Sequence, residues 1–283
     1  MTASNAAEGR LTFQVFTGQD FALSNNAVLI CGQREAVLID TCLVLSDAAR
    51  LVDMIRAGGK TLKAVYITHA HPDHYFGNGV VQEAFPMATF YARPGVIDFM
   101  REYRAKLVHW RELFGNEMPR SLPMPVALEG ESTSLEGSEI RFVDLPIAET
   151  VHSTAFYVPQ ERAVIVGDLI FSHTHHYLAD TNYPESWIEA LSVVRGLGPI
   201  ERVFPGHGPA GGKELLDESE AWLRHYIEAS KSGARFTDVA KEMMRLYPHY
   251  DMAILLWMTR GPGFGLKGAK ELGVPKELLG PFE

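Results

Sequence analysis

The sequence has few cysteines and no long apolar run. These two features argue against a disulfide-stabilised protein and against a membrane-spanning one. Its two cysteines, Cys31 and Cys42, border a predicted hairpin in which Cys31 pairs with Ala36 and Cys42 lies beyond the paired region. We therefore expect two free thiols, as in a reducing compartment. No apolar run approaches the roughly 20 residues that span a bilayer, and the N-terminus has no charged start followed by an apolar stretch. These absences predict a cytoplasmic protein with no membrane partner.

Basic residues are scarce relative to acidic ones. Lysine and arginine total 26 against 35 aspartates and glutamates, which gives a formal charge of −9 without any basic cluster. Phosphate binding rests on a basic footprint, so nucleic acid is not an expected partner. Hydrophobic residues make up 46% of the 283 positions, enough for a large core. We expect one large domain over residues 1–212 and a helical extension, packed on it, over residues 213–283.

The order of apolar runs predicts the class of the fold. Runs typical of strands cover residues 11–16, 26–32, 35–40, 63–68, 138–147, 154–159, 163–171 and 201–208. Helical spacing covers residues 45–59, 186–198 and nearly everything after 212. Two strand-rich blocks are thus each followed by helices, which predicts an α+β fold with sheets packed together and helices outside.

Residues 69–74 read His-Ala-His-Pro-Asp-His and directly follow a predicted buried strand. This places three imidazoles and a carboxylate within six positions, a density that folding does not require. In extended chain His69 and His71 point to the same side, so both can reach one ion. A turn at the proline can redirect Asp73 and His74 to another ion. Imidazole nitrogen and carboxylate oxygen are ligand types that zinc accepts.

Three further candidate ligands lie at the ends of apolar strands. They are His152 in AETVHSTAF, Asp168 in VIVGDLIF and His207 in FPGHGPAGG. Asp168 is the most informative, because an unpaired buried charge costs several kcal/mol and this carboxylate must leave the core or find a cation. We expect the three to converge with residues 69–74.

This set of motifs resembles the metallo-β-lactamase superfamily, which carries H-x-H-x-D-H, a downstream His, a bridging Asp and a final His. The resemblance covers roughly residues 11–210 and implies a four-layer αββα sandwich with metals at one edge. It implies that one ion is bound by His69, His71 and His152, the other by Asp73, His74 and His207, with Asp168 as the bridge. Asp40 matches a strand-end carboxylate that hydrogen-bonds ligand residues from behind.

The family's third motif commonly reads Gly-His-Thr or Gly-His-Ser, with another Gly and a Ser or His beyond. Here Val151 precedes His152, and Phe156 lies where a small or polar residue is usual. Cys42 also stands where the family often has Gly, and we interpret it as a small buried residue and not as a ligand.

The resemblance implies a metal-dependent hydrolase that cleaves an ester, lactone, thioester or related bond of a small molecule. Its cofactors would be two divalent ions, zinc by ligand type, with iron or manganese as alternatives. Asp73 is the expected acid–base residue. An iron-dependent oxidoreductase of the persulfide dioxygenase type and a β-lactam hydrolase are the alternatives. The latter is disfavoured because lactamases with a Cys ligand lack the carboxylate found here at Asp168.

Candidate substrate contacts follow the ligand motifs in the sequence. They are Tyr75, His175, His176 and Tyr177, each with a surface or core position as the alternative. The run 252–258 is apolar on almost every face, more than a lone surface helix would expose. We expect it to pack near the site, with residues 95–119 as the other wall of a pocket, or to form a homodimer interface.

Overall fold

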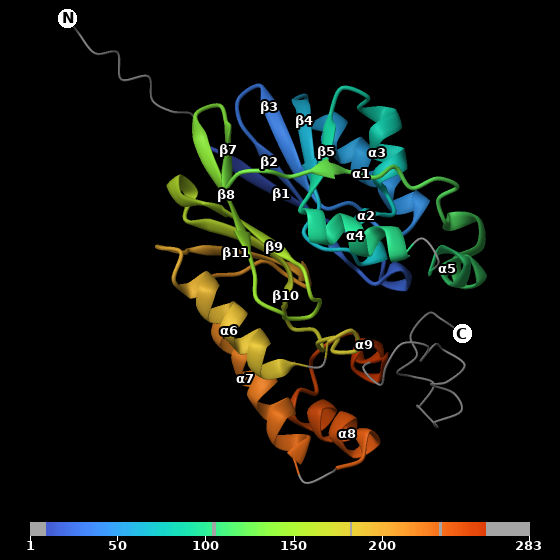
Figure 1. Ribbon diagram of the computed structural model, residues 1–283, viewed down its shortest axis with the longest axis vertical. Helices are drawn as coiled ribbons and strands as arrows, with labels where there is room; N and C mark the ends of the chain where they lie inside the picture. The colour runs from blue at the N-terminus through green and yellow to red at the C-terminus, as the bar shows by residue number, and fades with distance from the viewer. Residues whose placement is uncertain (1–9, 104–105, 182, 232–233, 259–283) are drawn as a thin grey trace, which may run out of the picture.

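The computed structural model describes residues 10–103, 106–181, 183–231 and 234–258. Within these ranges two β-sheets pack on each other, and helices cover their outer faces (Figure 1). The chain therefore has the expected α+β class and αββα layers. Among the described helices, none is long and apolar enough to cross a membrane.

The first sheet has six strands that neighbour one another in sequence order. They are β1 (Thr12–Thr17), β2 (Asn26–Cys31), β3 (Glu35–Ile39), β4 (Thr61–Tyr66), β5 (Thr89–Ala92) and β6 (Val126–Ala127). The first three strands pair antiparallel and the rest pair parallel. Cys31 pairs with Ala36, and both cysteines are buried free thiols, as predicted.

The second sheet has five strands in the order β11-β10-β9-β8-β7. They are β7 (Ser132–Leu135), β8 (Ser138–Asp144), β9 (Thr154–Val158), β10 (Ala163–Phe171) and β11 (Arg202–His207). Only the pair β10 and β11 is parallel among them, and α6 (Pro184–Arg195) connects these two strands. All nine residues of β10 are buried. A strand covered on both faces is expected to be an almost continuous apolar run, and here only Gly167 and Asp168 interrupt the apolar side chains.

The helices that follow strands of the first sheet lie on the same side of the molecule as that sheet, away from α6, α7 (Glu214–Ala229) and α8 (Phe236–Leu246) (Figure 1). They are α1 (Leu45–Ala57), α2 (Pro72–Tyr75), α3 (Asn78–Ala84), α4 (Pro94–Tyr103) and α5 (Lys106–Phe114), with short 3₁₀ turns η1 (Asp20–Ala22), η2 (Gly115–Glu117) and η3 (Pro159–Glu161) elsewhere. In β2, Ala27 and Leu29 belong to the core beneath the helices, whereas Val28 and Ile30 belong to the core between the sheets. This alternation follows from the two-residue period of a strand.

Three helices follow residue 212: α7 (Glu214–Ala229), α8 (Phe236–Leu246) and α9 (Ala253–Met258). In α9 the side chains from Ile254 to Trp257 are buried, so the apolar run packs on the rest of the chain. This is one of the two arrangements expected for residues 252–258. The domain boundary at residue 212 stays a prediction.

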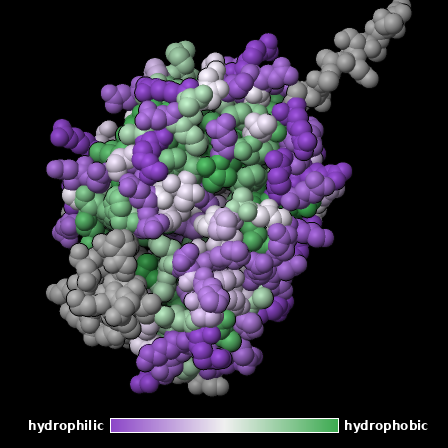
Figure 2. Space-filling model, turned by 180° about the vertical axis from the view of Figure 1, so that it is seen from behind, coloured by the Kyte–Doolittle hydropathy of each residue, from purple (hydrophilic) through white to green (hydrophobic). Residues whose placement is uncertain are grey.

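The large hydrophobic residues that are exposed are scattered over the surface. Figure 2 shows the face opposite to that of Figure 1, where hydrophilic side chains surround separate hydrophobic patches. The large hydrophobic residues that are exposed come from different elements: Val15, Met87, Leu113, Val126, Ile147, Tyr183, Val193 and Leu246. Scattered exposure of this kind needs no partner to explain it. The homodimer stays a prediction.

The segment after β10 connects the C-terminal helices to the sheets through a buried histidine. His176 stacks on Trp222 of α7 with ring centroids 4.3 Å apart, and its Nε2 lies 2.8 Å from the hydroxyl of Ser219. Burial lowers the pKa of His176 to about 3. The imidazole is therefore neutral in the folded chain at neutral pH.

We predict that His176 makes stability fall as the pH falls below about 6.5. Below this pH the unfolded chain binds a proton at His176 and the folded chain does not. The free energy of unfolding should therefore decrease by about 2 kcal/mol between pH 7.5 and pH 5.0. His176→Gln should lose this increment, measured as the difference between the urea unfolding free energies at the two pH values. His173→Gln, at an exposed histidine of the same segment, should behave like the wild type. An unchanged pH dependence in His176→Gln would contradict the prediction.

Candidate metal centre

Seven histidine and acidic side chains gather in two buried groups where several strands of the two sheets end. The first ligand group comprises His69, His71, Glu149 and Asp168, and the second ligand group comprises Asp73, His74 and His207. Within each group, one potential ligand atom per residue lies within 4.8 Å of the others. The residues come from the segment after β4, the β8–β9 loop, β10 and β11.

The segment after β4 supplies both groups because it changes direction at Pro72. His71 is still extended, with φ −79° and ψ 142°, and Pro72 begins α2 at a position where its fixed φ suits the first helical turn. His69 and His71 therefore belong to the first ligand group, and the helical turn carries Asp73 and His74 to the second. The turn at Pro72 thus separates His69 and His71 from Asp73 and His74.

Asp168 lies between the two groups. Its Oδ1 is 3.2 Å from His74 Nε2, and its Oδ2 is 3.4 Å from His207 Nε2 and 3.7 Å from His69 Nε2. Gly206 on β11 permits this position, because a Cβ there would overlap Asp168 Oδ1. One carboxylate thus faces ligand atoms of both groups.

Asp40 orients two of the histidines from behind. The backbone N–H and the hydroxyl of Thr68 donate to its two oxygens at 2.7 Å, and His74 Nδ1 donates to its Oδ2 at 2.8 Å. His69 Nδ1 lies 2.9 Å from the Thr68 hydroxyl, which accepts its proton because that hydroxyl already donates to Asp40. Both imidazoles are thereby held with Nε2 toward the site.

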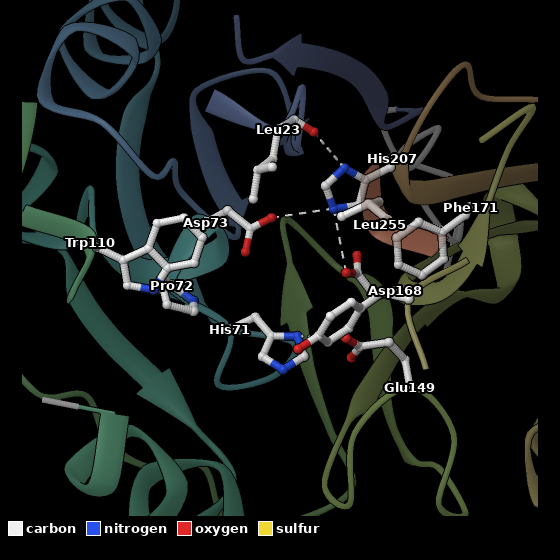
Figure 3. A pocket seen from close by; sticks show the side chains of 11 residues that line it. Leu23, His71, Pro72, Asp73, Trp110, Glu149, Asp168, Phe171, His207 and Leu255 are labelled. Atoms are coloured by element: carbon white, nitrogen blue, oxygen red, sulfur yellow. Dashed lines mark hydrogen bonds and ion pairs between the residues drawn. The ribbon is translucent and has the colours of Figure 1, made fainter. Parts of the chain in front are cut away.

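The other two histidines are also held by one ring nitrogen. His207 Nδ1 donates to the carbonyl of Leu23 at 2.8 Å, which directs its Nε2 to Asp73 and Asp168 (Figure 3). His71 is held the other way round, with Nε2 2.8 Å from Asp180 Oδ2 and Nδ1 2.7 Å from Glu149 Oε1. Each ring therefore has one nitrogen fixed by the protein and one nitrogen facing the site.

The electrostatics of the groups fit divalent ions. Although burial would raise the pKa of the Asp73 carboxyl, His74 and His207 lower it to about 2. Burial would lower the pKa of His207, but Asp168 and Asp73 raise it to about 9. Burial raises the pKa of Glu149 to about 7 against the opposing effect of His71. Carboxylates buried together require positive charge, which divalent ions supply.

The donor atoms fit metal ions as well. Nε2 of His69 and Nε2 of His74 are buried without a hydrogen bond. A buried polar atom without a partner costs about 1–3 kcal/mol, so such atoms mark places where a ligand is expected. Imidazole nitrogens and carboxylate oxygens are also the donors that zinc, iron and manganese accept.

The structure places His152 outside both ligand groups. This histidine is exposed, lies against Gly95 at the start of α4, and meets Phe99 edge to ring with centroids 5.5 Å apart. Glu149 lies in the first ligand group instead. The sequence held a signal for this assignment: Glu149 precedes Thr150 and is followed by Ser153, as the histidine of the family's third motif precedes Thr and is followed by Ser.

The candidate substrate contacts separate into core and pocket residues. Tyr75 is fully buried against Phe76, and His175 and His176 are buried against Trp222 of α7, so none of these three lines the pocket at the metal centre. Tyr177 does line it. Its hydroxyl donates to Asp180 Oδ1 at 3.1 Å. The residue pattern did not indicate Asp180, which is 109 positions from its partner His71.

A pocket opens over both ligand groups (Figure 3). Its polar floor includes members of the two groups, and its walls are apolar. The lining residues are Leu23, His71, Pro72, Asp73, Trp110, Glu149, Asp168, Phe171, Tyr177, His207 and Leu255. Trp110 belongs to α5 and Leu255 to α9. The helical segment before residue 119 and the C-terminal apolar run thus supply walls of one pocket, as expected.

The chain matches known proteins over most of its length. A family model described as the metallo-beta-lactamase superfamily matches residues 21–207. A metallo-beta-lactamase type 2 of Bacteroides fragilis is 22% identical over 212 residues, which cover 73% of this chain and 78% of that protein. A hydroxyacylglutathione hydrolase of Rhodopseudomonas palustris (strain BisA53) is 25% identical over 161 residues, 57% of this chain and 54% of that protein.

A solved structure, a metallo-beta-lactamase from Pontibacter korlensis, superimposes with a TM-score of 0.59 at 19% identity. The match covers 77% of this chain and 96% of that one. At this identity the likeness shows the fold.

We predict that Glu149 and not His152 holds metal. Glu149→Gln keeps the shape of the side chain but removes its charge, so zinc affinity of one site should fall at least about tenfold. His152→Ala, three residues away and exposed, should bind zinc like the wild type. Zinc titration followed by elemental analysis measures both variants, with circular dichroism as the check of folding. Loss of zinc from His152→Ala alone would contradict the assignment.

Proposed function

The chain belongs to the metallo-β-lactamase superfamily, and on this premise we propose that it is a dinuclear metal-dependent hydrolase of a small molecule. The observation that carries the proposal is the position of Asp168, whose two oxygens face imidazoles of both ligand groups. The bond cleaved would be that of an ester, lactone or thioester.

Each ligand group supplies two imidazoles and one carboxylate of its own, and Asp168 is shared between them. His69, His71 and Glu149 would hold one ion, and Asp73, His74 and His207 the other. Divalent ions held by these residues would polarise a carbonyl oxygen and would lower the pKa of a coordinated water toward about 7. We favour zinc because of the types of donor atom. The three carboxylates among the ligands would also suit manganese or iron.

Asp73 is the residue we assign to proton transfer. It lines the pocket, and its Oδ2 lies 3.3 Å from His207 Nε2 and 3.6 Å from His74 Nε2. These histidines lower the pKa of its carboxyl to about 2, against the effect of burial, so the group is ionised at neutral pH. Its Oδ1 would accept a proton from water and return it to the leaving group.

A second candidate function is favoured by Glu149. With His69 and His71 it forms two imidazoles and one carboxylate around one position, a donor set that non-haem iron oxygenases use. The second ligand group argues for hydrolysis, because a mononuclear iron site does not need Asp73, His74 and His207. Iron content together with oxygen consumption on persulfide would support the oxidoreductase, and zinc content together with ester or lactone cleavage would support the hydrolase.

We predict about two divalent ions per chain in protein prepared without chelator, and a marked effect of Asp168→Asn. This variant keeps the shape but removes the charge shared by the two groups. It should lower the occupancy of at least one site and reduce ester or lactone hydrolysis about 100-fold or more. Asp217→Asn, at an exposed carboxylate of α7, is the matched control.

Elemental analysis and steady-state kinetics on a panel of p-nitrophenyl esters, lactones, thioesters and a β-lactam provide the measurement. Full activity of Asp168→Asn with two ions bound would refute the bridging role.

A further inference from the structure

The pocket over the metal centre has a specific chemical character. We infer that it selects an uncharged substrate with a compact apolar group and discriminates against anionic substrates of the same shape. The inference rests on the proposed function, because it concerns the same site.

The first observation is the origin of the apolar walls. Trp110 comes from α5, Leu255 from α9 and Leu23 from the turn after η1, so three distant parts of the chain bring hydrophobic side chains to one opening. Phe171 at the end of β10 adds a fourth wall, stacked on the ring of His207 at 5.1 Å. Figure 3 shows these side chains around the carboxylates of the site. Burial of apolar substrate surface against such walls favours binding.

The second observation is the charge of the lining. Among the described residues that line the pocket, three carry carboxylates and none is a lysine or arginine. An anionic group on a substrate would therefore meet no lysine or arginine among these described lining residues. Burial of such a group without a partner is unfavourable.

The third observation is the effect of Glu149 on the charge of the centre. Two divalent ions bring four positive charges, and the carboxylates of Asp73, Asp168 and Glu149 offset three of them. If a neutral histidine stood at the position of Glu149, only the carboxylates of Asp73 and Asp168 would remain, and they would offset two of the four charges. Asp180, 2.8 Å from His71, adds a further negative charge beside the centre. The loaded centre thus attracts anions less than a centre with a neutral third imidazole would.

Tyr177 does not supply a hydrogen-bond donor for an anionic group of the substrate. It lines the pocket, and its hydroxyl proton is committed to Asp180 at 3.1 Å. The hydroxyl oxygen that remains is an acceptor, which repels a carboxylate or a sulfate.

Binding of simple hydroxamates to the zinc-loaded protein tests the inference without turnover. Hydroxamates chelate zinc, so their side chains report on the walls. By isothermal titration, 4-methylpentanohydroxamate should bind more tightly than acetohydroxamate by about fourfold for each methylene that the walls bury. Succinic monohydroxamate has the same branched shape with a carboxylate, and it should bind at least about tenfold more weakly than 4-methylpentanohydroxamate.

Variants of the wall separate the pocket from the metals. Leu255→Ala should weaken 4-methylpentanohydroxamate and leave acetohydroxamate nearly unchanged. Leu255→Lys should reverse the order of the branched pair toward the anionic probe. Leu246→Lys, an exposed leucine of α8, is the matched control and should keep the wild-type order.

Equal or tighter binding of the anionic probe by the wild type would overturn the inference, even if ester hydrolysis were established. The preferred binding of the apolar probe without hydrolysis of any ester, lactone or thioester would refute the proposed function and uphold the inference. An identical order of the probes in Leu255→Ala, Leu255→Lys and the wild type would overturn the role of the walls.

Discussion

The burial of Asp168 is the constraint on which the rest of the site depends. Its carboxylate lies in a strand of the second sheet whose nine residues are all buried, where an unpaired charge would cost several kcal/mol. Three imidazoles face its two oxygens, two from the segment after β4 and one from the end of β11, and each of those rings is fixed by a hydrogen bond from its other nitrogen. The arrangement is complete only with additional positive charge, because the neighbouring carboxylates of Asp73 and Glu149 are buried too.

The fold supplies this arrangement by bringing the ends of strands together. The segment after β4, the end of β11 and the middle of β10 belong to two different sheets, and the packing of the sheets places their polar residues side by side. Asp40 follows β3 in a left-handed conformation, φ 62°, and serves His69 and His74 together. A positive φ in a residue other than glycine is uncommon and costs energy, which is consistent with a position kept for its function.

Much of the fold and most of the ligand set could be predicted from local patterns. The strands are apolar runs, and His69, His71, Asp73 and His74 lie at a density that folding does not require. The ligand of the third motif was harder to predict from the sequence. Glu149 resembles an ordinary polar residue of a loop, and His152, three positions later, was the residue that the sequence pattern favoured. The tertiary structure shows that His152 lies against α4 while Glu149 faces His71, and the Thr and Ser that follow Glu149 were the one local sign of this.

Other contacts could not have been read from the sequence at all. Asp180 meets His71 across 109 positions, and Leu255 reaches the same pocket as Trp110 through the packing of α9. The most direct test of the account is anomalous diffraction from crystals of the zinc-loaded protein. We predict two zinc peaks, with Glu149 as a ligand of one, Asp168 as a ligand of both, and His152 bound to neither. A single peak, or a zinc ion bound to His152 instead of Glu149, would contradict it.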